Sequence, residues 1–180
     1  MNSLAKIVEP NPAFTREIIA GGPNKAGGGD TLMLCYQCGT CTASCPSGRL
    51  TAFRTRQLVR RGQLGLKDEV LPTEELWLCT TCYQCVERCP RNVEITDLIF
   101  IMRNIAAKEG FMSDQHKKIG ENMMAIGSTV PFPDTMKKVR ADMGLPAEPP
   151  TTVSDQKAMA DFRKVMEACG FDSLMKGGKK

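Results

Sequence analysis

Apolar residues recur along much of the chain at the three- and four-residue spacing of amphipathic helices, and they do not alternate as they would in strands. The clearest helix is predicted over residues 94–109, with Gly110 ending it. Because Phe100 and Ile101 fall outside its main stripe, we expect this helix to be covered on more than one side, either by the chain's own tail or by another protein of a complex. The stripe itself comprises Ile95, Leu98, Ile99, Met102 and Ala106.

Shorter periodic segments predict further helices, so that the chain is expected to be all-α. These segments span residues 12–20, 49–61, 73–78, 114–126 and 134–143. A last helix is predicted from an N-cap at Ser154 to about Cys169, with Gly170 as its stop. Cys169 is then expected to behave as a small core residue rather than as a ligand. The stripe of this helix comprises Ala158, Met159, Phe162, Val165, Met166 and Cys169.

Eight of the nine cysteines lie in two runs of identical spacing, C-x2-C-x2-C-x3-C-P, offset by 44 residues. The runs are Cys35-Tyr-Gln-Cys38-Gly-Thr-Cys41-Thr-Ala-Ser-Cys45-Pro46 and Cys79-Thr-Thr-Cys82-Tyr-Gln-Cys85-Val-Glu-Arg-Cys89-Pro90. This is the bacterial-type spacing for [4Fe–4S] clusters, in which the fourth cysteine of each run ligates the other cluster. Three cysteines on one tight loop can hold three corners of a cluster, and the proline after the fourth redirects the chain.

The spacing therefore predicts two [4Fe–4S] clusters with exchanged ligands. The first is assigned to Cys35, Cys38, Cys41 and Cys89, and the second to Cys79, Cys82, Cys85 and Cys45. Structural zinc is the alternative, but zinc usually takes two short cysteine pairs separated by a longer loop. Four cysteines within eleven residues, repeated once, favour iron–sulfur clusters. Trp77 is expected to pack beside a cluster.

Composition and charge indicate a protein of a reducing compartment, in which its thiols are expected to bind metal. Neither a signal-peptide core in residues 1–10 nor a bilayer-spanning apolar run is visible, so a cytoplasmic protein without membrane contact is expected. The formal net charge of +4 could suggest nucleic acid. However, eight thiolates and two oxidised cluster cores would together add about −4. The holo-protein is then near neutral, and a nucleic-acid partner is not expected.

Three segments are expected along the chain. Residues 1–31 form an N-terminal arm and a glycine-rich connector, residues 32–112 a dicluster [4Fe–4S] ferredoxin-like domain, and residues 113–180 a helical C-terminal extension ending in a solvated tail at residues 176–180. The glycine-rich run 21–29 lacks the G-K-[ST] ending of a phosphate loop and is interpreted as a flexible connector.

The predicted clusters favour electron transfer over catalysis within this chain. Four thiolates per cluster leave no iron open for a substrate, and no nucleophile–base pair or nucleotide-binding motif occurs elsewhere. The single histidine, His116, has no expected catalytic partner. Two adjacent clusters would form a two-step path for single electrons, with a donor beside one and an acceptor beside the other.

The residues around the cysteines resemble the C subunit of heterodisulfide reductase. The resemblance is carried by Leu34-Cys-Tyr-Gln-Cys-Gly-Thr-Cys-Thr-Ala-Ser-Cys-Pro-Ser-Gly48 with Thr51-Ala-Phe-Arg-Thr-Arg56, and by Leu78-Cys-Thr-Thr-Cys-Tyr-Gln-Cys-Val-Glu-Arg-Cys-Pro90 with Val93-Glu-Ile-Thr-Asp97. It covers about residues 30–112 firmly, and all eight family ligands are present at matching positions.

The resemblance implies an α-helical ferredoxin-like relay subunit in a cytoplasmic complex of methanogenesis. It would pass electrons from the flavin-bearing A subunit of heterodisulfide reductase to the B subunit, whose CCG motifs hold the clusters that reduce the mixed disulfide of coenzyme M and coenzyme B. A hydrogenase is a further candidate partner in the larger complex. No CCG motif occurs here, so the reducing site is expected elsewhere.

Two other functions stay open from the residues alone. One is the iron–sulfur relay subunit of a different oxidoreductase, of succinate/fumarate or glycolate type. The succinate/fumarate hypothesis would also need a plant-type C-x4-C-x2-C segment, which the sequence lacks. The other is a zinc-bearing structural module.

Overall fold

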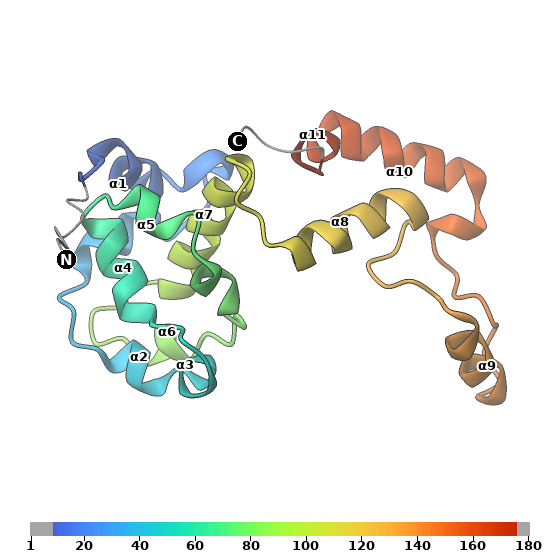
Figure 1. Ribbon diagram of the computed structural model, residues 1–180, viewed down its shortest axis with the longest axis horizontal. Helices are drawn as coiled ribbons and strands as arrows, with labels where there is room; N and C mark the ends of the chain where they lie inside the picture. Colours follow the sequence, from blue (N-terminus) through green and yellow to red (C-terminus); the bar gives the residue numbers. More distant parts are fainter. Residues whose placement is uncertain (1–8, 176–180) are drawn as a thin grey trace, which may run out of the picture. The chain divides into compact units, whose positions relative to one another are not determined.

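The computed structural model describes residues 9–175, and these residues divide between two compact units, Met1–Phe111 (unit 1) and Met112–Lys180 (unit 2). The expected tail at residues 176–180 lies outside the described part. Residues 9–175 contain helices, turns and loops but no strand, as the all-α prediction requires (Figure 1). No helix in this range is both long enough and apolar enough to span a bilayer.

Unit 1 contains seven α-helices and three short 3₁₀-helices (η) in its described residues. In chain order they are α1 (Pro12–Ile19), η1 (Gly22–Asn24), η2 (Gly29–Leu34), α2 (Thr40–Ser44), α3 (Pro46–Leu50), α4 (Thr55–Gln63), α5 (Lys67–Val70), η3 (Glu74–Leu78), α6 (Gln84–Glu87) and α7 (Ile95–Lys108). Asn11 caps α1, because its side-chain oxygen accepts hydrogen bonds from the backbone N–H groups of Ala13 and Phe14.

Helix α7 is the centre of the unit 1 core. It was predicted over residues 94–109 and is confirmed with bounds one residue inside each end. It is buried on more than one face, since Ile101 is fully buried although it lies off the predicted stripe, while Phe100 is 37% exposed. The cover comes from segments of the same unit, including α1, η1, η2 and α4. The expectation of cover by the chain's tail or by another protein was therefore wrong for the face that carries Ile101.

The N-terminal residues supply much of that cover. Phe14 and Ile18 of α1 are core residues, so α1 is packed into unit 1. The glycine-rich run 21–29 was expected to be a flexible connector, and its flexibility stays a prediction. It forms a compact turn in which the amide of Ala26 donates to the carbonyl of Gly21. At Gly22 an added Cβ would lie 3.1 Å from Ile101 Cγ2, so glycine permits the close approach of the turn to α7.

The helix predicted over residues 49–61 is two helices, α3 and α4, with an extended break between them. Thr51 is extended, and Phe53 in the break is 1% exposed. The Arg54 guanidinium donates to the carbonyls of Gly48, Thr51 and Phe53, which replaces the intrahelical hydrogen bonds that the break removes. Gly62, expected as the stop, lies inside α4. The chain turns instead at Gly65, which has φ +70°.

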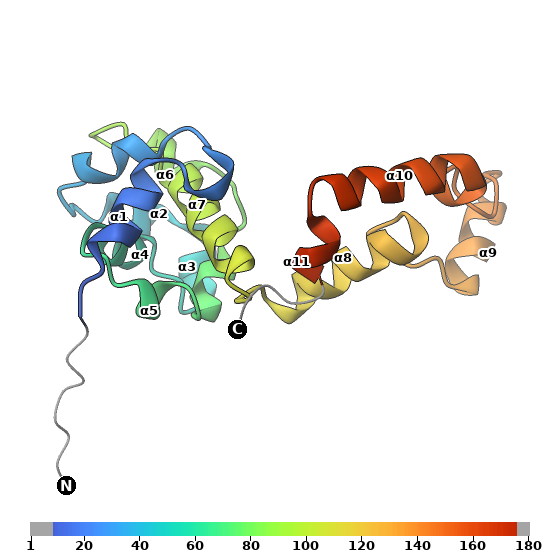
Figure 2. The ribbon, with the colours of Figure 1, turned by 90° about the horizontal axis from the view of Figure 1, so that it is seen from above.

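Unit 2 contains α8 (Asp114–Ile126), α9 (Asp134–Asp142), η4 (Thr152–Ser154), α10 (Gln156–Ala168) and α11 (Phe171–Met175). The bounds of α8 and α9 confirm the predictions for these helices to within one residue. Helix α10 begins one residue later than predicted, because Asp155 and not Ser154 is its N-cap. Helices α8 and α10 lie side by side within the unit (Figures 1 and 2). Gly127, which follows α8, packs against Met159 of α10.

The predicted stripe of α10 does not form a core. Met159 is buried, but Val165 is 63% exposed. Cys169 is exposed as well, so its prediction as a core residue was wrong. It is the C-cap residue of α10, where the helical path ends. Among the described residues of unit 2, only Gly120, Met159 and Met175 are buried.

Candidate metal centre

The two cysteine runs form the same loop twice. Each run follows a 3₁₀-helix, η2 before Cys35 and η3 before Cys79. In the first loop Gln37 (φ 68°) and Gly39 (φ 87°) are left-handed. At the positions 44 residues later, Thr81 (φ 56°) and Tyr83 (φ 59°) are left-handed too. Left-handed conformation costs a non-glycine residue about 1–2 kcal/mol, so both loops maintain a strained path that curls the chain around its cysteines.

The side-chain exposure of the cysteines also repeats between the loops. Cys35 and Cys79 are half-buried, Cys38 and Cys82 are exposed, and Cys41 and Cys85 are buried. The third cysteine of each run lies on a short helix, α2 or α6, and these two helices pack against each other. This packing brings the two loops close together within unit 1.

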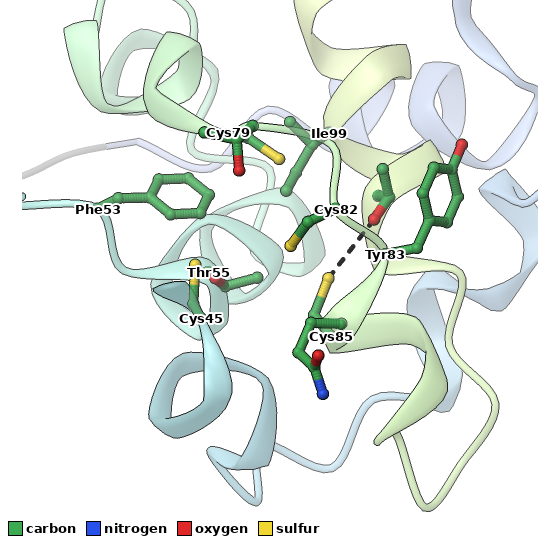
Figure 3. A pocket seen from close by; sticks show the side chains of 11 residues that line it. Cys45, Phe53, Thr55, Cys79, Cys82, Tyr83, Cys85 and Ile99 are labelled. Atoms are coloured by element: carbon green, nitrogen blue, oxygen red, sulfur yellow. Dashed lines mark hydrogen bonds between the residues drawn. The ribbon is translucent and has the colours of Figure 1, made fainter. Parts of the chain in front are cut away.

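One cavity, called site 2, is lined by Cys79, Cys82 and Cys85 of the second run and by Cys45 of the first. Figure 3 shows their sulfur atoms around a common space. The rest of the lining is mostly apolar or uncharged and includes Phe53, Thr55, Thr80, Tyr83, Gln84, Thr96 and Ile99. No carboxylate lines it, so the donor set is four sulfurs in a largely apolar cavity.

A second cavity, called site 1, is lined by Cys35, Cys38 and Cys41 of the first run and by Cys89 of the second. Gln37, Gly39, Thr40, Arg56, Pro90 and Ile95 complete the lining. The structure thus groups all eight cysteines of the runs into two sets of four, each with three members from one run and one from the other. The ninth cysteine, Cys169, is in unit 2.

Backbone amides donate to the fourth cysteine of each run. The amide of Gly48 lies 3.4 Å from Cys45 Sγ, and the amide of Val93 lies 3.3 Å from Cys89 Sγ. In both cases the chain turns after the cysteine, and this turn directs a later backbone N–H toward the cysteine sulfur. Each of these N–H donors therefore points at a sulfur that would serve as a metal ligand.

Side chains supply further hydrogen bonds to sulfur. In site 1, Gln37 Nε2 donates to Cys35 Sγ at 3.4 Å, and the Thr40 hydroxyl lies 3.4 Å from Cys38 Sγ. In site 2, the Thr96 hydroxyl lies 3.5 Å from Cys85 Sγ. The hydrogen bond with Thr40 is the main reason that the pKa of the exposed Cys38 thiol is lowered.

Burial acts in the opposite direction on the inner cysteines. It raises the pKa of the Cys41 thiol to about 11, and it also raises the pKa of the Cys79 and Cys85 thiols. These thiols are therefore protonated at neutral pH until a metal takes the place of the proton. Metal binding by these thiols would therefore release protons and would be favoured by higher pH.

Arg103 of α7 fixes the chain that enters the second loop. Its guanidinium donates to the carbonyl of Leu76 at 2.9 Å and to that of Cys79 at 2.8 Å. It also lies over the Trp77 ring, 5.6 Å from the centroid. Trp77 packs against the unit 1 core but lines neither cavity, so its place beside a cluster stays a prediction. The sequence did not predict this role of Arg103, although a cation that follows the apolar run 98–102 was a usable signal.

The four sulfurs of each cavity suit a four-iron cluster better than a single ion. Zinc would draw four sulfurs to about 2.3 Å from one centre, and hence to within about 4 Å of each other. Within residues 9–175, no group of three or more cysteine, histidine, aspartate or glutamate side chains is positioned to hold one metal ion. A cubane presents four separate iron corners, so it fits a wider set of thiolates that surround a space.

Comparison with known proteins agrees with this donor set. A family model described as a 4Fe-4S dicluster domain matches residues 31–93, which contain all eight cysteines of the two runs. Residues 31–93 therefore form a domain of the 4Fe-4S dicluster class.

Similar proteins define the family more narrowly. The C subunit of the H(2):CoB-CoM heterodisulfide,ferredoxin reductase of Methanothermobacter thermautotrophicus is 49% identical over 84% of this chain and 82% of its own length. The iron-sulfur C subunit of the CoB–CoM heterodisulfide reductase of Methanopyrus kandleri is 42% identical over 97% of this chain and 85% of its own. The C subunit of the ferredoxin:CoB-CoM heterodisulfide reductase of Methanosarcina mazei is 41% identical over 83% and 92%. The chain belongs to this family of heterodisulfide reductase C subunits, whose members are iron–sulfur electron-transfer subunits of an oxidoreductase complex.

Proposed function

We propose that this chain holds two [4Fe–4S] clusters and relays single electrons from the flavin-bearing A subunit of a heterodisulfide reductase to its B subunit, where the CoM-S-S-CoB heterodisulfide of methanogenesis is reduced. The observation that carries the proposal is the crossed grouping of the cysteines into site 1 and site 2. In this assignment Cys35, Cys38, Cys41 and Cys89 hold one cluster, and Cys79, Cys82, Cys85 and Cys45 hold the other.

The chain's own contribution is to fill every ligand position and to limit access. When bound, the clusters supply reversible one-electron chemistry. The strained loops hold three thiolates of each site in place, and the exchanged fourth cysteine ties the sites together. The buried Cys41 and Cys85 keep part of each site away from water, whereas the exposed Cys38 and Cys82 leave one edge of each site near the surface. Those two edges are the proposed entry and exit points for electrons.

The partners follow from the family. The relatives are named as subunits of heterodisulfide reductase systems, so partner proteins are expected for this chain too. We assign the flavin-bearing A subunit as donor and the B subunit as acceptor, with a hydrogenase as a candidate source of electrons in a larger cytoplasmic complex. The disulfide-reducing site would then belong to the acceptor and not to this chain.

The first test is the metal content of the full chain purified without oxygen. We expect about eight irons and eight sulfides per chain, with an EPR spectrum of two interacting reduced clusters. About two zinc atoms and no sulfide would overturn the proposal.

The exchanged ligation can be tested separately with three cysteine variants. Cys38→Ser and Cys82→Ser each alter an exposed ligand of one site and so assign the two EPR signals. If ligands are exchanged, Cys45→Ser perturbs the signal that Cys82→Ser perturbs, although Cys45 lies in the first run. Perturbation of the Cys38→Ser signal instead would exclude exchange. Cys169→Ser is the control and should change neither signal, because Cys169 is exposed in unit 2.

A further inference from the structure

Two buried polar side chains face the same cavity. Among the described residues, Thr55 and Thr96 are the two polar or charged residues that are fully buried, each 1% exposed. Both line site 2 and neither lines site 1. They come from different elements, since Thr55 begins α4 and Thr96 lies in the first turn of α7. A buried hydroxyl ordinarily has a hydrogen-bond partner, so each of the two requires an acceptor.

Thr96 has a hydrogen-bond partner and Thr55 does not. The Thr96 hydroxyl is paired with Cys85 Sγ at 3.5 Å. The Thr55 Oγ1 atom is buried and has no hydrogen-bond partner in the structure. In Figure 3, Thr55 lies among the sulfur atoms of site 2, between Cys45 and Cys85 in that view. Leaving a buried hydroxyl unpaired is unfavourable, which indicates that its partner is a group bound in the cavity.

We propose that the Thr55 hydroxyl donates a hydrogen bond to a sulfur of the cluster held in site 2 and thereby raises the reduction potential of that cluster. This inference rests on the proposed function, because it requires a cluster in site 2. Adding an electron increases the negative charge on the cluster sulfurs. A donor hydrogen bond therefore stabilises the reduced form more than the oxidised form. Thr55 acts through the cluster sulfur and is a positioning and tuning residue, not a ligand.

The hydroxyl that faces a cysteine of site 1, that of Thr40, is more exposed to water. Thr40, which bonds Cys38, is exposed, and so is Cys38 itself. Water can replace a hydroxyl donor there, whereas it cannot easily reach Thr55. Hydrogen bonds are also electrostatically stronger in a buried, low-dielectric environment. Loss of the Thr55 hydroxyl should therefore have a larger effect than loss of the Thr40 hydroxyl.

The test compares the two midpoint potentials of the holo-protein in three variants, by redox titration followed by EPR. Thr55→Val removes the donor while keeping the shape, and we expect it to lower the potential of the site 2 signal and to leave that of site 1 unchanged. Thr55→Ser keeps the hydroxyl and should restore the wild-type potential. Thr40→Val is the matched control and should lower the site 1 potential by a smaller amount. The signals are assigned by Cys38→Ser and Cys82→Ser.

The outcomes separate this inference from the proposed function. If the wild-type protein lacks two iron–sulfur clusters, the proposed function fails. If both clusters are present and Thr55→Val leaves the site 2 potential at its wild-type value, the role of Thr55 fails while the relay stands. If Thr55→Val shifted the potentials of both sites equally, the role of Thr55 would also fail, because equal shifts would indicate a general change of structure. If Thr55→Val does not load iron, Thr55→Ala removes the same donor with a smaller side chain and is judged by the same shift.

Discussion

Two helices of nearly equal length, one in each unit, differ strongly in how many of their residues are buried. Helix α7 of unit 1 has 14 residues, of which eight are buried, whereas α8 of unit 2 has 13 residues and buries only Gly120. Both carry apolar residues at helical spacing. The difference teaches that periodicity determines where a helix forms, while burial depends on whether other elements cover its apolar face. In unit 1 that cover comes from α1, η1, η2 and α4.

The units differ in the same way in their apolar surface. Unit 1 packs twenty buried residues into one hydrophobic cluster, to which the cysteine loops are joined. In unit 2, large apolar side chains on or directly after three helices remain in solvent, including Ile119 (42% exposed), Val139 (52%), Met143 (70%) and Val165 (63%). Unit 1 should therefore respond strongly to side-chain changes that unit 2 tolerates, and paired substitutions can test this.

The largest expected difference comes from truncating an apolar residue in each unit. Leu98→Ala in α7 removes a fully buried side chain and should lower the free energy of unfolding of unit 1 by about 2–5 kcal/mol. Val165→Ala in α10 removes an exposed side chain and should change stability by about 0.5 kcal/mol or less. Urea denaturation of the holo-protein without oxygen, read by helical circular dichroism and cluster absorbance, measures both. Comparable losses in the two variants would contradict the contrast between the units.

A glycine in each unit gives the next comparison. Alanine at Gly29 would place its Cβ against the backbone carbonyl of Ile18 and 2.8 Å from that of Ile19, neither of which can move freely. We expect Gly29→Ala to destabilise unit 1 by about 1–3 kcal/mol.

Gly120→Ala in α8 is the matched variant. Its Cβ would meet the flexible side chain of Met175 and would lie 3.1 Å from Phe171 Cζ, while alanine gains up to about 1 kcal/mol of helix propensity over glycine. The net change in stability should stay within about 1 kcal/mol by the same denaturation measurement. A loss at Gly120 as large as that at Gly29 would show that unit 2 is more tightly packed than its exposure indicates.

The sequence predicted the parts of the fold that local chemistry determines. Helices at residues 12–19, 95–108, 114–126 and 134–142 match their periodic segments closely. It did not predict the break between α3 and α4, which depends on Arg54 reaching three carbonyls. Nor did it predict the compact turn at Gly22, which depends on Ile101 far along the chain. Such contacts between distant residues leave no periodic signal.

The same distinction applies to the candidate site. The repeated cysteine spacing predicted which four cysteines would lie together, and the two cavities are lined by those sets; their ligation of clusters stays a prediction. Thr55 and Arg103 were not selected, because their roles depend on where α4 and α7 pass the loops. Spacing therefore identifies residues that share a loop, whereas the groups that surround the site require the fold.

Arg103 tests how firmly the core is connected to the second cysteine loop. Arg103→Gln removes donors to the carbonyls of Leu76 and Cys79, and leaves part-buried acceptors without partners. We expect a loss of about 1–3 kcal/mol and faster hydrogen exchange in residues 74–85. Arg140→Gln in unit 2 is the matched control, since Arg140 donates to the Pro146 carbonyl in an exposed position and its loss should cost about 0.5 kcal/mol or less. Equal effects would mean that Arg103 does not support the loop.

The smallest expected effect concerns the helix caps, where the two units should differ in the extent of the response. Asp155 accepts from the amides of Lys157 at 2.8 Å and Ala158 at 3.2 Å, and Asp155→Ala should cost about 0.5–2 kcal/mol. Because few buried side chains hold α10, this loss should appear as faster hydrogen exchange over its first two turns. Asn11→Ala removes the corresponding cap of α1, but the fully buried Ile18 anchors that helix, so faster exchange should stay within the first turn. If α1 frayed as far as α10, core packing would not explain the difference between the units.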